Sequence, residues 1–280
     1  MIINNPFAEL SAVVSPSIMQ GYVVLMVVLV VVGTIMDMAH KQSAKYFFEN
    51  SKRAQKAAKR QVSSGEKFGL AVKTVTNEVL TSSEFNNQKR RMSHLLTMYG
   101  FLIFVITTAV LIFKHPNNDS ATLVSLMWHV GAAMLAYGGL WFWLFIRVDV
   151  LAEGVKWYNF NGRGDFFIVG LISTGVFGLL WSFGQQLGIL EWFFFVLFIA
   201  SATMLFGTVY WSKFAHMFFK PAAAYQKKIT VADGSRENLP NDYDLTDPAV
   251  QAKFPDIPEY MGKNPPYMGL GISREPPSHY

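Results

Sequence analysis

Long apolar runs separated by polar segments dominate this chain. Five of them are long enough to cross the hydrocarbon core of a bilayer, which takes about 20 residues of helix. These runs cover residues 18–39, 95–113, 123–148, 166–183 and 189–212. The pattern predicts an all-α fold: an integral membrane five-helix bundle with a cytoplasmic helical loop and an extended C-terminal tail.

The segment between the first two runs differs in kind. Residues 40–93 carry twelve Lys and Arg against four Glu. Its second half repeats apolar residues at helical spacing: Phe68, Ala71, Val72, Val75 and Val79. This spacing predicts a helix lying at the membrane interface. A basic amphipathic segment is also typical of nucleic-acid or calmodulin-type sites. Its place between two spans favours a cytoplasmic, positive-inside loop, with the N-terminus outside and the C-terminus inside.

These observations divide the chain into four parts. They are a first transmembrane helix (1–39), a basic cytoplasmic or interfacial loop (40–93), a four-helix transmembrane region (94–220) and a cytoplasmic Pro-rich tail (221–280). The tail holds nine of the twelve prolines, and Pro221 at its start limits unkinked continuation of a helix. Its large apolar side chains favour an extended arm that binds a partner over a disordered terminus. Residues 1–17 contain no Lys or Arg, so we expect no cleavable signal peptide.

Small residues recur at four-residue spacing inside two of the runs. They are Gly170, Thr174 and Gly178 in the fourth run, and Ala132 and Ala136 in the third. Such faces let membrane helices approach closely, so we expect them to pack against neighbouring helices.

The chain contains no cysteine. Disulfides, iron–sulfur clusters and covalently attached haem are therefore excluded on this chain. Any cofactor must be held by His, Met, carboxylates or packing.

Histidines near the membrane boundaries are the candidate ligands. His94 starts the second run and His216 follows the fifth, so the predicted topology places both near the cytoplasmic face. Neutral imidazoles from two facing helices ligate b-type haem, and we expect one haem at this pair. Arg90 and Arg91 would pair with its propionates or with anionic headgroups. His129 lies in the outer third of the third run. It either contacts a quinone or a second cofactor, or it is a structural residue.

Two stretches carry a family resemblance. Residues 90–101 read Arg-Arg-Met-Ser-His-Leu-Leu-Thr-Met-Tyr-Gly-Phe, and residues 213–221 read Lys-Phe-Ala-His-Met-Phe-Phe-Lys-Pro. Both resemble the five-span cytochrome b-like membrane subunits related to the gamma subunit of nitrate reductase, which include heterodisulfide-reductase-type membrane subunits. The resemblance covers roughly residues 75–225. Together with an N-terminal Asn-Pro-Phe-Ala-Glu-Leu start, it makes the chain most similar to membrane anchors associated with adenylylsulfate reductase.

The resemblance implies a function in sulfur metabolism at the bacterial inner membrane. Such a subunit would anchor a cytoplasmic flavin/iron–sulfur oxidoreductase and exchange electrons with the quinone pool, through one haem b on His94 and His216. Two-haem relatives carry further histidines on the same two spans. Phe104 and Phe198 stand at those positions here, so the outer haem is not expected.

Two alternatives remain at this point. A purely structural membrane anchor without a cofactor would have the same fold, with histidines used for packing and hydrogen bonding. A small transporter would need polar groups through the midplane, whereas the centres of the first, second and fifth runs are almost wholly apolar. No catalytic residue and no nucleic-acid partner are predicted, so the chain is a non-catalytic or quinone-reactive subunit.

Overall fold

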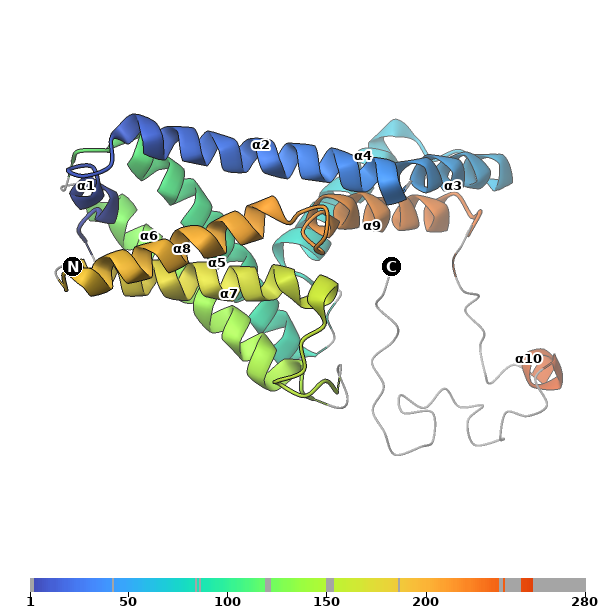
Figure 1. The fold of residues 1–280 in the computed structure, drawn as a ribbon. Helices are drawn as coiled ribbons and strands as arrows, with labels where there is room; N and C mark the ends of the chain where they lie inside the picture. The colour runs from blue at the N-terminus through green and yellow to red at the C-terminus, as the bar shows by residue number, and fades with distance from the viewer. Residues whose placement is uncertain are drawn as a thin grey trace. The chain divides into compact units, whose positions relative to one another are not determined.

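All regular secondary structure in the described residues is helical (Figure 1). The computed structural model describes residues 3–41, 43–83, 85, 87–118, 122–149, 154–185, 187–236, 239 and 248–253. The elements are α1 (Pro6–Leu10), α2 (Pro16–Lys41), α3 (Ser43–Ala57), α4 (Ser64–Thr74), the π-helix η1 (Val75–Leu80), α5 (Gln88–Lys114), α6 (Thr122–Trp141), the π-helix η2 (Phe142–Ile146), α7 (Gly162–Phe183), α8 (Ile189–Gly207), α9 (His216–Ala232) and α10 (Pro248–Lys253).

Within the described residues, five helices are long and apolar enough to cross a membrane. They are α2, α5, α6 together with η2, α7 and α8, and they coincide with the five predicted runs. The all-helical membrane fold is therefore confirmed, and the lipid bilayer is a partner of the chain. Which terminus lies on which side stays a prediction.

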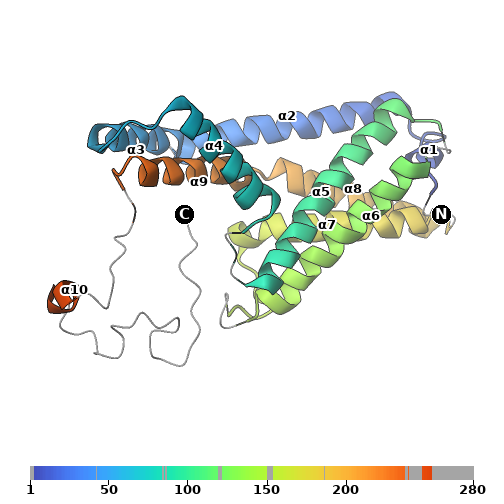
Figure 2. The same ribbon diagram turned by 180° about the vertical axis from the view of Figure 1, so that it is seen from behind.

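The chain divides into two compact units. Unit 1 comprises residues 1–45 and 88–219, and unit 2 comprises residues 46–87 and 220–280. In unit 1, α5 and α6 form an antiparallel pair that crosses a second antiparallel pair, α7 and α8 (Figures 1 and 2). Helix α2 packs on α8 and α5. Only 17% of its most apolar stretch is buried, against 44% for α6, so α6 is central and α2 peripheral.

Glycines bring the backbones of α5 and α6 into contact. A Cβ atom on Gly100 would lie 2.5 Å from the backbone nitrogen of Leu135, and one on Gly131 would lie 2.7 Å from that of Phe104. One on Gly138 would lie 2.7 Å from the backbone nitrogen of Thr97. No side chain fits at any of these points without moving a helix, because backbone atoms lie within 2.7 Å of each Cβ position.

The predicted small faces are used, but against different neighbours. A Cβ atom on Gly175 of α7 would lie 3.0 Å from the carbonyl oxygen of Ala132 and 3.1 Å from the backbone nitrogen of Ala136, so the alanine face of α6 packs on α7 as expected. Gly170 and Gly178 instead face α8, against Leu205 and Phe198.

At one end of unit 1, which we call the α1 end, an N-terminal segment covers the bundle. Asn5 begins this segment: its Oδ1 accepts a hydrogen bond from the Phe7 amide (3.0 Å), and its Nδ2 donates to the carbonyl of His115 (2.7 Å). The Phe7 ring, 3% exposed, contacts Trp128 and Trp181 at centroid distances of 5.8 and 5.3 Å. The segment thus seals the bundle with a buried aromatic side chain.

At the opposite end, which we call the α9 end, residues 208–215 also seal the bundle with a buried aromatic side chain. The ring of Phe214 is 2% exposed and lies 6.2 Å from Phe101 of α5, 5.4 Å from Phe167 of α7 and 6.0 Å from Phe206 of α8. Three helices therefore converge on one phenylalanine.

The fifth span is shorter than its apolar run. Helix α8 ends at Gly207, and turns follow, in which the backbone amides of Trp211 and Ser212 both donate to the carbonyl of Thr208 (2.9 Å each). The prediction of a span reaching residue 212 is wrong, because Val209 and other apolar residues of these turns are buried at the α9 end rather than in a helix.

The predicted tail also begins differently. Helix α9 runs through Pro221 to Ala232, so the first twelve residues of the tail are helical. Pro221 is the sixth residue of α9 and lies inside the helix, where it cannot donate a hydrogen bond to the carbonyl four residues earlier. The remaining tail, on which we predicted the partner-binding arm, lies outside the described residues except for 233–236, 239 and α10.

Unit 2 joins the basic loop to the start of the tail. The carbonyl of Asp233 accepts hydrogen bonds from the amides of Lys59 (2.9 Å) and Arg60 (3.2 Å). Lys228 of α9 forms an ion pair of 3.0 Å with Glu78 of η1. Two segments that are far apart in sequence therefore form one folded part.

We expect the α5–α6 contact to be intolerant of side chains. Gly131→Leu should lower the free energy of unfolding by about 1–3 kcal/mol or more, since a Leu there meets backbone. Gly21→Leu on the exposed face of α2, where nothing lies within 4 Å of a Cβ atom, is the matched control and should be neutral or slightly stabilising. Unfolding in detergent followed by circular dichroism measures both; equal stability of the two variants would contradict the contact.

Candidate functional site

The two predicted haem ligands belong to the same end of unit 1. His94 is half-buried in the second turn of α5, beside Ser93, whose Oγ donates to the carbonyl of Gly138 (2.8 Å) and ties α5 to α6. Phe101 lies two turns further along the same face of α5 and contacts Phe214, which precedes His216 by two residues. The structure therefore brings the neighbourhoods of His94 and His216 to the α9 end.

His216 does not lie on a membrane span. It is exposed and is the first residue of α9, eight residues past the last residue of α8. Its Nδ1 is hydrogen-bonded to the carbonyl of Lys213, which can only accept, so Nδ1 carries the proton and Nε2 the lone pair. The ring packs edge-on against Phe167, with centroids 5.8 Å apart.

Aromatic side chains pack tightly at the α9 end, close in sequence to His216. Phe101, Phe206 and Phe214 lie in mutual contact at 6.0–6.2 Å, between α5 and residues 208–215. A flat macrocycle that entered this cluster would have to displace the buried Phe214. The tautomer of His216 suits a metal ligand, and a haem held by His94 and His216 stays a prediction.

Arg90 and Arg91 lie next to His94, as the sequence requires. Both are half-buried in the first turn of α5. Their two predicted roles, pairing with haem propionates or with anionic headgroups, both stay predictions.

His129 is enclosed by protein at the α1 end. It is 3% exposed, and its Nδ1 donates to the carbonyl of Ser125 (2.7 Å) while its Nε2 accepts from the hydroxyl of Ser182 (2.7 Å). Trp128 and Phe183 pack on the ring at 4.9 and 5.7 Å. Both ring nitrogens have hydrogen-bond partners, one on α6 itself and one on α7, which supports the structural role rather than the quinone contact.

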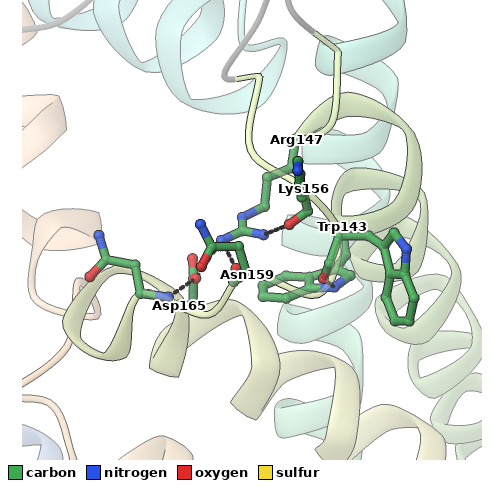
Figure 3. Close-up of polar contacts among 7 residues, drawn as sticks. Trp143, Arg147, Lys156, Asn159 and Asp165 are labelled. Atoms are coloured by element: carbon green, nitrogen blue, oxygen red, sulfur yellow. Dashed lines mark hydrogen bonds and ion pairs between the residues drawn. The ribbon is translucent and has the colours of Figure 1, made fainter.

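The main polar cluster of unit 1 surrounds Arg147, which follows η2 (Figure 3). Its guanidinium forms an ion pair of 2.5 Å with Asp165 of α7, and the two side chains are only 3% and 11% exposed. It also donates to the carbonyls of Asn159 (2.7 Å) and Lys156 (3.3 Å). The ring of Trp143 lies 4.1 Å beneath it.

This cluster folds the connection between the third and fourth spans. Asp165 Oδ2 also accepts from the amide of Asn161, the residue before α7, at 2.7 Å. Trp143 Nε1 donates to the carbonyl of Trp157 at 3.0 Å. One buried cation therefore satisfies backbone groups of the loop and fixes the start of α7.

Sequence reasoning missed this cluster. Arg147 lay inside the predicted run 123–148, and Asp165 was counted in a mixed loop. The signal available was a lone arginine at the end of one apolar run and a lone aspartate at the start of the next, since unpaired charges are costly at membrane depth.

A shallow apolar groove of about 310 Å³ lies on the outward face of α6 and η2. It is lined by Tyr137, Leu140, Trp141, Leu144 and Phe145. Its lining is lipid-facing in any membrane placement of α6, since these side chains point away from the bundle.

We expect Arg147→Met to destabilise the protein strongly. The substitution strands the buried Asp165 carboxylate, and breaking a buried pair costs about 3–5 kcal/mol. Urea unfolding in detergent and limited proteolysis of residues 154–161 are the measurements. The double substitution Arg147→Met with Asp165→Leu should recover much of the loss, because no charge is then left buried.

The exposed pair of Arg60 and Glu66 in unit 2 is the matched control. Its bidentate contact at 2.5 and 2.9 Å holds the pKa of Glu66 below its ordinary value, through the hydrogen bond from Arg60. This stabilisation is present above the pKa of an unfolded Glu, about 4.3, and is lost as the pH falls through the folded value. Because the pair is exposed to solvent, Arg60→Gln should change the free energy of unfolding little at pH 7. An effect equal to that of Arg147→Met would contradict our assignment.

The described part of unit 1 thus holds a filled aromatic cluster beside two histidines, a saturated histidine and a buried ion pair. The chain matches no protein-family model, no curated protein and no solved structure. Its membrane fold is shown by its own five helices.

Proposed function

We propose that this protein is the membrane subunit that anchors a cytoplasmic flavin/iron–sulfur oxidoreductase, of the adenylylsulfate reductase type, to the bacterial inner membrane. Unit 1 supplies the anchor and unit 2 the docking surface. The identity of the partner comes from the resemblance of residues 90–101 and 213–221, and the orientation from the positive-inside pattern.

The charge of unit 2 carries the proposal. Over its full sequence unit 2 holds fourteen Lys and Arg against twelve Asp and Glu, but its described residues hold twelve against four. On α3 the side chains of Lys52, Arg53 and Lys56 are exposed. A folded basic part attached to membrane spans suits an acidic soluble partner, because complementary charge steers and orients association.

Electron exchange with quinone is the second element of the proposal. The groove beside Trp141 opens to lipid, where a quinone ring can reach it by diffusion in the bilayer, and aromatic walls suit a flat ring. Electrons would pass between this quinone and the partner's own cofactors. No step is assigned to a haem, because a haem between α5 and residues 208–215 would have to displace the buried Phe214.

The interior of unit 1 counts against the transporter alternative. Trp128 and Trp181 are fully buried behind Phe7 at the α1 end, and Phe214 closes the α9 end. A purely structural anchor shares all these features and differs only in having no quinone-linked activity.

Charge reversal on α3 should weaken docking. With Lys52→Glu, Arg53→Glu and Lys56→Glu combined, the Kd of purified adenylylsulfate reductase for proteoliposomes should rise about tenfold or more, since tenfold is only about 1.4 kcal/mol. The measurement is co-flotation of the enzyme with vesicles at several salt concentrations. Lys114→Glu, at the opposite end of α5, is the matched control and should bind normally.

Two outcomes would contradict this prediction. Wild-type proteoliposomes that bind the enzyme no better than empty vesicles would overturn the anchor. Binding that survives the triple reversal would remove α3 as the docking surface. If docked enzyme reduces no quinone, the purely structural anchor is correct.

The filled aromatic cluster predicts the absorption spectrum of the purified protein. We expect no Soret band after expression with ample haem, and none that depends on His216. A stoichiometric Soret band that disappears in His216→Ala would show that Phe214 moves aside and that our reading of the cluster is wrong.

A further inference from the structure

Unit 2 exposes an apolar stripe on α4 and η1. Phe68 is 72% exposed, Val72 45% and Val75 50%, although each is a large apolar side chain. They are spaced by four and three residues, so they lie along one face. On the same helix Thr74 is 2% exposed, which places the protein-facing side elsewhere on α4.

The surroundings of the stripe are open and basic. A Cβ atom added to Gly65 or Gly69 would meet nothing within 4 Å. Lys67 and Lys73 are exposed and lie on either side of the stripe, about 100° and 140° around the helix from Phe68. An apolar ridge with lysines on both flanks is the pattern of helices that lie in the headgroup layer of a membrane.

The chain keeps this stripe close to a bilayer. Helix α3 starts two residues after the span α2, and the span α5 starts eight residues after η1. Eight extended residues reach at most about 28 Å, so the end of η1 stays within about 28 Å of the start of α5 and the stripe remains tethered near the bilayer.

We propose that the stripe of Phe68, Val72 and Val75 inserts into the interfacial layer of an anionic bilayer, with Lys67 and Lys73 on lipid phosphates. Three side chains are too few for a protein interface, which buries about 800 Å² on each partner. They suffice for a surface helix that is already tethered. The inference does not depend on which enzyme docks, and it separates the lipid-facing side of unit 2 from the basic surface of α3.

The cysteine-free chain allows a direct test. Phe68→Cys and Val72→Cys, both at exposed positions that should not disturb folding, are each labelled with an environment-sensitive fluorophore and placed in nanodiscs that contain phosphatidylglycerol. Gln61→Cys, exposed in the linker before α4, is the control. Lipid-borne spin labels should quench positions 68 and 72 severalfold more than position 61, and aqueous iodide should show the reverse order.

The charge of the flanks is tested in the same nanodiscs. Lys67→Gln and Lys73→Gln are each added to Phe68→Cys. Each should lower the ratio of the lipid-inserted stripe to the free stripe about fivefold. The same loss should follow when phosphatidylcholine replaces phosphatidylglycerol.

Three outcomes would overturn the proposal. In the first, iodide quenches positions 68 and 72 as well as position 61. In the second, all three positions are protected equally. In the third, positions 68 and 72 become protected in detergent as protein concentration rises, which would identify a second copy as the occupant. None of these depends on adenylylsulfate reductase, so failure here leaves the anchor proposal to its own test.

Discussion

The contact between the backbones of α5 and α6 is the constraint on which unit 1 depends. Gly100, Gly131 and Gly138 leave no room for side chains between the two helices. In lipid there is no hydrophobic gain from bringing apolar helices together, so close van der Waals contact has to hold them. The same contact aligns Ser93 with the carbonyl of Gly138 and sets Phe104 against Trp128, with ring centroids 5.1 Å apart. The aromatic core and the start of α5 are thus placed by residues that have no side chain.

Much of this fold could be read from the sequence, because a bilayer imposes length and apolarity on every span. The predicted end of the fifth span was wrong, because some apolar residues of that run do not cross the membrane. Val209, Phe214 and Ala215 extend the fifth run, but they fill the end of the bundle in turns. Gly131 and Gly138 lie seven residues apart on one face of α6, but the backbone that they meet on α5 appears only in three dimensions.

The candidate site was partly predictable for the same reason. Topology predicts His94 and His216 at one membrane face, since helix direction follows from the order of spans, but the structure places His216 beyond the last span, at the start of α9. It could not show that phenylalanines occupy the space beside them, because residue type does not reveal which way a ring points. Arg147 and Asp165 illustrate the converse: each looks incidental in its own segment, and only their meeting makes a buried ion pair.

The α1 end has a consequence for how the protein is made. Gln185 Nε2 donates to the carbonyl of Pro6 at 2.6 Å, and Asn5 Nδ2 to that of His115, so the N-terminal segment closes on residues synthesised much later. At about 5–20 residues per second, roughly 10–35 s separate the emergence of Pro6 from that of Gln185. Phe7 therefore cannot complete its contact with Trp181 before the fourth span has been made. The first residues of the chain and a helix made much later thus have to meet before the α1 end is closed.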